Sequence, residues 1–195
     1  MRPVCATFFA ALLAILCAPA PVMAASAVTL VLQFDQAYSA QLLTEMEREV
    51  ASIVRESGIR VAWRLRADVR SSESFESLVV VHFRGACTID LDAAPDDRRY
   101  YAFTYVSGGA VLPFSEVECD KIGNSIRTVI PRRQWGEREA LLGRALGRVL
   151  AHELFHMLAK TQHHAAEGVT KSDLSPAQLI ADKLGMARVD LEKLR

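Results

Sequence analysis

One segment of the chain, residues 137–159, repeats apolar side chains at helical spacing and constrains the fold more than any other part. Its stripe of leucines consists of Leu142, Leu146, Leu150, Leu154 and Leu158. Leucines four residues apart lie on one face of an α-helix, so this face must be buried. Gly143, Gly147 and Ala151 form a second stripe, of small residues. Because glycine weakens a helix, the small stripe predicts close approach of the helix to a sheet or loop.

The end of this predicted helix carries a pair of histidines. His152 and His156 are four residues apart and Glu153 follows the first, in the pattern H-E-x-x-H. On a helix, both imidazoles face the same side and can reach one metal ion. Zinc accepts neutral imidazole nitrogens, and a catalytic zinc keeps one position open for water. Glu153 is placed to take a proton from that water, so the pattern predicts a hydrolytic zinc site.

A third metal ligand is expected after the helix, because two histidines alone make a weak site. If the helix continued to His164, its Cα would lie about 18 Å along the axis from that of His152, at 1.5 Å per residue. Two side chains on one zinc cannot span that distance, so the chain must leave the helix after about Lys160 and turn back. The candidate third ligands are His163, His164, Glu167, Asp173 and Asp182.

The pentapeptide followed closely by another histidine resembles the zincin metallopeptidases, and within them the metzincins. Metzincins have a glycine three residues and a third histidine six residues after the second histidine, where this chain has Ala159 and Gln162. His164 and Gly168 follow the second histidine by eight and twelve residues. That spacing resembles a looser set of short, secreted, metzincin-like bacterial proteins.

The resemblance implies a cofactor, Zn²⁺, and a set of site residues. The implied zinc ligands are His152, His156 and His164, and the implied general base is Glu153. His163 remains the main alternative for the third ligand. Glu167 is expected on the surface or as a group that orients a ligand. Metzincins also place a methionine turn under the zinc; Met186 is the candidate, with a core methionine as the alternative.

The other segments predict an α+β fold. A helix is expected at 39–57, after the first strand, and a short C-terminal helix at 175–185. The expected strands are residues 27–34, 59–65, 78–83 and 100–106, with one more near 125–130 in an otherwise ambiguous region. This order predicts one mixed, twisted sheet of about four to five strands with helices on it, and it resembles the metzincin order of elements.

The chain begins with a candidate secretory leader. Residues 1–24 combine one basic residue, an apolar run and a small-residue stretch ending at Ala24, as signal peptides do. Cleavage there leaves residues 25–195, which suit a single zincin-like catalytic domain, secreted or periplasmic. A lipid anchor at Cys17 is an alternative, although the residue before it is not the usual glycine or alanine. The apolar run is short for a membrane span, so we expect no membrane association after cleavage.

Charge and cysteines limit the partners and the compartment. The predicted leader holds one of the 23 basic residues and none of the 23 acidic ones, so the mature chain is nearly neutral. A nearly neutral chain has no net positive electrostatic field that would attract nucleic acid. Cys87 and Cys119 remain after cleavage, and two cysteines in an exported chain most often form one disulfide. The alternative is that Cys87 is a thiolate switch on the zinc.

These features predict a secreted zinc-dependent metallopeptidase that acts as a monomer on peptide or protein substrates. Two alternatives use the same residues: a non-catalytic zinc-binding or interaction module, and a zinc hydrolase of a non-peptide amide. An edge strand beside the histidine helix is expected to bind an extended peptide by main-chain pairing. Tyr100, Tyr101 and Tyr105 are expected to pack in the sheet, with a role as oxyanion donors as the alternative. His82 is expected to be a core or edge histidine, with a site role as the alternative.

Overall fold

The computed structural model describes residues 27–91 and 100–195. Its centre is a five-stranded sheet with the strand order β2-β1-β3-β5-β4. The strands are β1 Ala27–Phe34, β2 Arg60–Leu65, β3 Leu78–Arg84, β4 Ala102–Ser107 and β5 Ala110–Glu118. The pairs β1–β2, β1–β3 and β3–β5 are parallel, whereas β4 runs antiparallel to β5 and forms one edge of the sheet. The predicted leader, residues 1–24, lies outside the described residues and stays a prediction.

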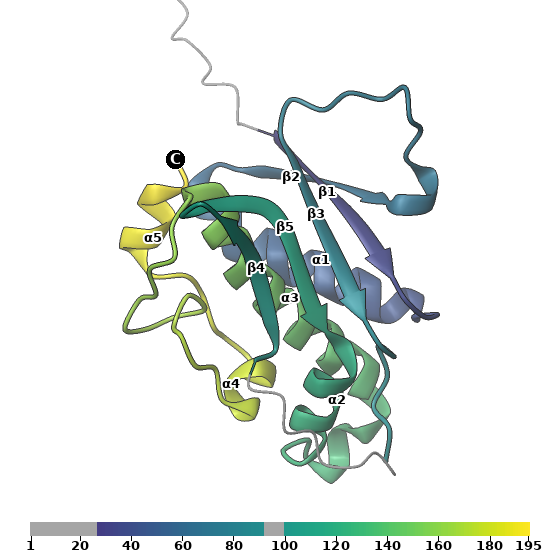
Figure 1. Ribbon diagram of the computed structural model, residues 1–195. Helices are drawn as coiled ribbons and strands as arrows, with labels where there is room; N and C mark the ends of the chain where they lie inside the picture. Colours follow the sequence, from purple (N-terminus) through teal and green to yellow (C-terminus); the bar gives the residue numbers. More distant parts are fainter. Residues whose placement is uncertain (1–26, 92–99) are drawn as a thin grey trace, which may run out of the picture.

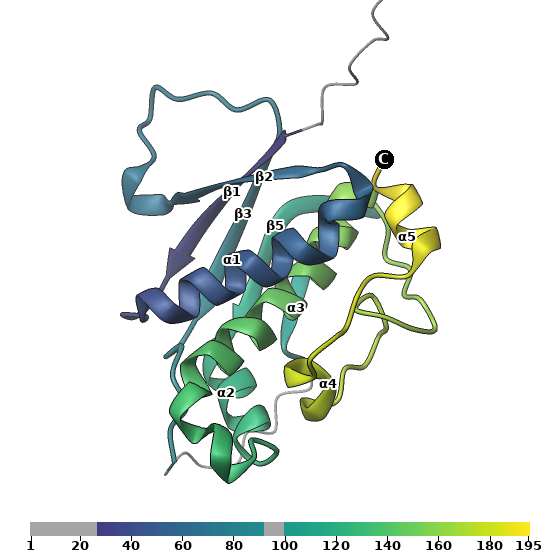
Figure 2. The ribbon, with the colours of Figure 1, turned by 180° about the vertical axis from the view of Figure 1, so that it is seen from behind.

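Helices cover one face of this sheet. The main ones are α1 Ala40–Val54, α2 Cys119–Arg127 and α3 Arg138–Ala159. Figure 1 looks onto the sheet with the helices behind it, and Figure 2 shows α1 and α3 crossing the covered face side by side. Three short 3-10 helices are Arg55–Ser57, Arg66–Asp68 and Arg132–Glu137. The α+β class, the mixed sheet and the long helix are confirmed.

The core lies between the sheet and α3, and the leucine stripe of the sequence forms much of it. Leu142, Leu146 and Leu150 are each at most 1% exposed. From the sheet, Leu30 and Phe83 point toward them from alternating positions of β1 and β3, as half-buried strands require. Burying such side chains is worth about 1.5–3 kcal/mol each, so this layer fixes α3 against the sheet.

The small-residue stripe of α3 packs against another helix, and the prediction of a sheet or loop partner was wrong. A Cβ added at Gly143 would lie 2.5 Å from the Leu42 carbonyl oxygen of α1, and one at Gly147 would lie 2.9 Å from that of Met46. Real Cβ atoms do not approach so closely. Glycine therefore lets the backbones of α1 and α3 come together along two helical turns.

The strand expected near residues 125–130 does not form; residues 125–127 are the end of α2, and a turn follows. Strand β5 ends at Glu118, and the buried residues that follow are Cys119, Ile122, Gly123 and Ile126. Their spacing of three and four is helical, although the β-branched isoleucines favour a strand locally. The prediction was wrong because burial against α3 and the sheet overrides that local preference.

A disulfide between Cys87 and Cys119 joins the segment after β3 to the start of α2, with the Cα atoms 4.7 Å apart. The predicted pairing is confirmed, and the thiolate-switch alternative for Cys87 is wrong because its sulfur is bonded. Among the described residues, no helix has both the length and the apolar character that a membrane span needs.

The chain beyond α3 is mostly irregular. Its two short helices are α4 Pro176–Ile180 and α5 Arg188–Lys193. The Ser175 side chain caps α4, and Gln178 completes the capping box. The expected helix 175–185 is wrong in length, because α4 ends at Ile180 and α5 is separate.

Candidate metal centre

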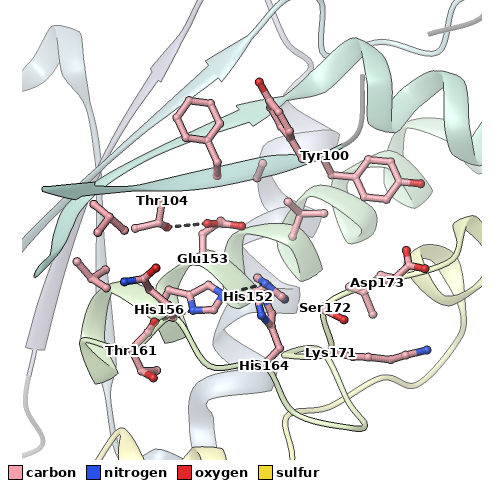
Figure 3. A pocket seen from close by; sticks show the side chains of 18 of the residues that line it. Tyr100, Thr104, His152, Glu153, His156, Thr161, His164, Lys171, Ser172 and Asp173 are labelled. Carbon is pink, nitrogen blue, oxygen red and sulfur yellow. Dashed lines mark hydrogen bonds between the residues drawn. The ribbon is translucent and has the colours of Figure 1, made fainter. Parts of the chain in front are cut away.

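The last turns of α3 present the histidine pair to a cavity. His152 and His156 lie on one face of the helix, as Figure 3 shows. The helix ends as predicted: Lys160 adopts a left-handed conformation with φ 51°, and the Thr161 amide donates to the His156 carbonyl. The chain turns away there, so the next residues can approach the histidines again.

The two helical imidazoles are locked in one orientation by main-chain carbonyls. Nδ1 of His152 donates to the Val169 carbonyl at 2.9 Å, and Nδ1 of His156 donates to the Thr161 carbonyl at 2.8 Å. A carbonyl oxygen only accepts, so both rings carry their proton on Nδ1 when they are neutral. The two Nε2 atoms, 3.0 Å apart, then face each other with their lone pairs. Two lone pairs that face each other at this distance repel unless they share a cation. Two nitrogen ligands of one tetrahedral zinc lie roughly 3.3 Å apart, close to the distance between these Nε2 atoms.

His164 completes a group of three. One nitrogen from each of His152, His156 and His164 lies within 4.8 Å of the others, an arrangement that could hold a metal ion. The His164 ring centroid is 5.1 Å from that of His152 and 4.7 Å from that of His156. His163 lies outside this group, so the geometry favours His164 of the two candidates. Glu167, Asp173 and Asp182 also lie outside it.

The loop that returns His164 depends on Gly168. This residue has φ 76°, a conformation that favours glycine, and an added Cβ would lie 2.8 Å from the Gly185 carbonyl oxygen. The Ala165 amide donates to the Thr170 carbonyl at 3.1 Å and closes the loop directly after His164. Gly168 therefore occupies the kind of turn position that the spacing predicts.

Burial keeps the three imidazoles in their neutral, metal-binding form. Burial lowers the pKa of His152 to about 4, although its hydrogen bond to Val169 acts in the opposite direction. Burial also lowers the pKa values of His156 and His164. Because a histidine must be unprotonated to bind a metal, these shifts favour metal binding at neutral pH.

Glu153 points into the same cavity and is only 5% exposed. The Thr104 hydroxyl, from strand β4, donates to its Oε2 atom at 2.6 Å. Burial raises the pKa of Glu153 to about 7, and the Thr104 hydrogen bond partly opposes this shift. A carboxylate with a pKa near neutrality can both accept and return a proton.

The cavity has a volume of about 540 Å³ and lies between β4 and the segment 171–174. Tyr100, Tyr101 and Phe103 line it from the β4 side, beside the histidines and Glu153. Tyr105 does not line it, and its hydroxyl instead donates to Glu116 at 2.7 Å. Two of the three tyrosines assigned to sheet packing thus border the site.

Met186 and His82 have structural surroundings. Met186 is 8% exposed and belongs to the core cluster, as the core-methionine alternative predicts. Its backbone lies next to Gly168, where an added Cβ would be 3.5 Å from the Met186 carbonyl carbon. His82 lies 2.5 Å from Asp35 through Nε2 and does not line the cavity. His82 lies on β3, the central strand, and its half-buried side chain is paired with Asp35, so it is neither an edge nor a fully buried core histidine.

Sequence reasoning missed Thr104, Val169 and Thr161. Thr104 lies 49 residues before Glu153 on another element, and a threonine in a strand carries no sign of a partner. Val169 and Thr161 act through their carbonyl oxygens, which every residue has, so the residue type gives no signal. Only the predicted reversal of the chain after Lys160 pointed to this part of the site.

No protein-family model, curated protein or solved structure matches this chain. The resemblance to zincins therefore rests on the motif, the spacing and the geometry described above.

Proposed function

We propose that the chain is a secreted zinc-dependent metallopeptidase, with His152, His156 and His164 as the zinc ligands. The observation that carries the proposal is the pair of facing Nε2 atoms, 3.0 Å apart, on rings whose Nδ1 atoms are both bonded to carbonyls. This donor set suits zinc, which prefers imidazole nitrogen and tetrahedral geometry. The disulfide Cys87–Cys119 supports an exported protein, because such bonds persist in oxidising compartments.

Glu153 is the proposed general base and acid. A zinc ion bound at this site supplies Lewis acidity, which polarises a carbonyl and lowers the pKa of water. Glu153 accepts the proton of the attacking water and returns it to the leaving amine. Thr104 holds one carboxylate oxygen, Oε2, and so leaves Oε1 for the proposed proton transfer. The buried position of Glu153 keeps its pKa in the range that proton transfer requires.

The proposed substrate is an extended peptide that pairs with β4. This strand is an edge of the sheet and lines the cavity through Ala102, Phe103 and Thr104. A peptide added to an exposed edge gains main-chain hydrogen bonds, which give affinity largely independent of sequence. Pairing along β4 would carry the peptide past Glu153, whose partner Thr104 lies on that strand.

The test combines metal analysis with peptide cleavage. The purified mature chain should hold about one zinc per molecule and cleave members of a peptide library. Glu153→Gln should keep the zinc and lose at least about 10²-fold in kcat, since it removes only the proton transfer. His164→Ala should lose zinc, whereas the matched variant His163→Ala should retain it.

Three outcomes would overturn parts of this proposal. A Glu153→Gln variant as fast as the wild type would refute the role of Glu153. Zinc in the wild type with no peptide cleaved would favour the non-catalytic module, or a hydrolase of non-peptide amides if such an amide is turned over. If His163→Ala lost zinc and His164→Ala kept it, the third ligand would be His163 instead of His164.

A further inference from the structure

Asp190 is a fully buried carboxylate that the proposed mechanism does not use. Its exposure is 0%, and it lies in the first turn of α5, far along the chain from the histidine pair. Burying a carboxylate costs several kcal/mol unless it is paired and hydrogen-bonded. The contacts of Asp190 therefore indicate what this buried charge holds in place.

Two groups bond to the carboxylate of Asp190. The Thr170 hydroxyl donates to Oδ2 at 2.6 Å, and Nζ of Lys193 donates to Oδ1 at 3.0 Å. Lys193 also lies 5.5 Å from the ring centroid of Phe155, the residue before His156. Figures 1 and 2 both show α5 beside the C-terminal end of α3, where the histidines lie.

Thr170 belongs to the dipeptide that supports two of the three histidines. Val169 and Thr170 are both 0% exposed. The Val169 carbonyl accepts from Nδ1 of His152, and the Thr170 carbonyl accepts from the amide of Ala165, next to His164. A displacement of this dipeptide would therefore disturb one helical imidazole and the loop imidazole together.

The negative charge of Asp190 is matched inside the protein. Lys193 donates to its Oδ1, so the pair brings little net charge to the site. The hydrogen bond from the Thr170 hydroxyl is therefore the contact through which Asp190 reaches the segment that supports the histidines.

We propose that Asp190 is a positioning residue for the metal centre: through Thr170 it fixes the segment that orients His152 and His164. The inference rests on the metal-binding part of the proposed function and not on peptide cleavage. The C-terminal helix α5, which contributes no ligand, is then required for metal affinity.

The experiment measures the dissociation constant for Zn²⁺ by competition with a chromophoric chelator, on the full mature chain. Asp190→Asn replaces the charged acceptor of both hydrogen bonds with little change in shape, and Thr170→Val removes the hydroxyl that donates one of them. Each should weaken Zn²⁺ binding about 10- to 100-fold. Thr170→Ser keeps the hydroxyl and should bind Zn²⁺ with the affinity of the wild type. Asp182→Asn is the matched control, because its side chain lies in the same segment but is 96% exposed; its affinity should stay within about twofold.

Co²⁺ absorption adds a readout that a loss of stability would not produce. The wild type should show the intense visible bands of a tetrahedral site, and Asp190→Asn and Thr170→Val should shift or weaken them at saturating Co²⁺. If Asp190→Asn does not fold, the Thr170→Val and Thr170→Ser pair carries the test. Unchanged Zn²⁺ affinity and Co²⁺ bands in the folded variants would overturn the role of Asp190. A wild type that binds no zinc would refute the metal site itself, and this inference with it.

Discussion

The described part of residues 27–159 and the C-terminal residues 160–195 both build the candidate metal centre, but they are stabilised differently. The first part consists of a sheet and three helices that bury regular apolar faces, such as Leu146 and Leu150 of α3. The second part has only α4 and α5, of five and six residues. Helices that short are not stable alone, so contacts with the first part must hold them.

Several of those contacts are buried and polar. Arg148, 0% exposed, donates from α3 to Glu49 of α1 at 2.7 Å and to the Ala181 carbonyl of the C-terminal segment at 2.6 Å. It also donates to the Gln178 carbonyl. Together with the bond between His152 and Val169, these contacts anchor an irregular segment to one helix. Apolar layers thus place the helical ligands, whereas the segment that carries the loop ligand is held by directional polar contacts together with single apolar side chains such as Leu179.

Replacement of Arg148 should have the largest effect. In Arg148→Met, the mostly buried Glu49 carboxylate loses its partner and the Gln178 and Ala181 carbonyls lose donors. We expect the free energy of unfolding to fall by about 3–5 kcal/mol, measured by urea denaturation. The control is Arg144→Met, which loses bonds to the same segment near its exposed partner Asp182 and should cost about 1 kcal/mol or less. Equal losses in the two variants would contradict the importance of the buried anchor.

Glu153 should make the metal-free protein less stable as the pH rises. Burial raises its folded-state pKa to about 7 from an ordinary value of 4.5. Between these values the folded state holds a proton that the unfolded state has released, so this contribution to stability falls with rising pH. Glu153→Gln removes the effect. The variant should match the wild type at pH 4 and exceed it by about 3 kcal/mol at pH 8.5.

The measurement is urea unfolding of chelator-treated protein at both pH values. Glu139→Gln is the matched control, because it removes the same charge at an exposed position of α3. The gain in stability at pH 8.5 should be specific to Glu153→Gln. A Glu153→Gln difference that is independent of pH would show that the carboxylate is not desolvated in the folded protein.

Much of the regular part could be predicted from the sequence, because its signals are local. Strand β1 has the predicted bounds, 27–34, and the four-residue spacing of His152 and His156 placed both rings on one face of α3. The spacing of Gly168 after His164 anticipated a turn, which its positive φ provides. These predictions need only the periodicity of an element or the conformational freedom of glycine.

The rest depends on contacts between distant segments. Nothing in the sequence near Gly143 says that its neighbour is α1 and not a strand, because a small residue is compatible with any close partner. Residues 125–130 suggested a strand, but burial of Ile126 against the core selected the end of a helix. The Val169 carbonyl reaches His152 because the chain reverses after α3, and the Thr104 hydroxyl reaches Glu153 because of the strand order in the sheet. Neither contact has a local signal in the sequence.

The smallest expected effect compares two serine caps, one in each part. Ser39 caps α1 by accepting from the Leu42 amide at 3.1 Å, and Ser175 caps α4 by accepting from the Gln178 amide at 3.3 Å. Each change to alanine should cost about 1 kcal/mol. Because α1 packs along α3, Ser39→Ala should lower global stability and speed the slowest amide exchange of both helices alike.

Ser175→Ala should act locally, because α4 belongs to the segment that can open without the sheet. The Leu179 amide, which donates to the Ser175 carbonyl at 3.0 Å, should then exchange about fivefold faster, while the amides of α3 keep their rates. Native-state hydrogen exchange of the two variants measures both effects. If Ser175→Ala accelerated exchange throughout α3 as well, the C-terminal segment would unfold only together with the sheet, and the polar anchors would belong to the same cooperative unit as the apolar core.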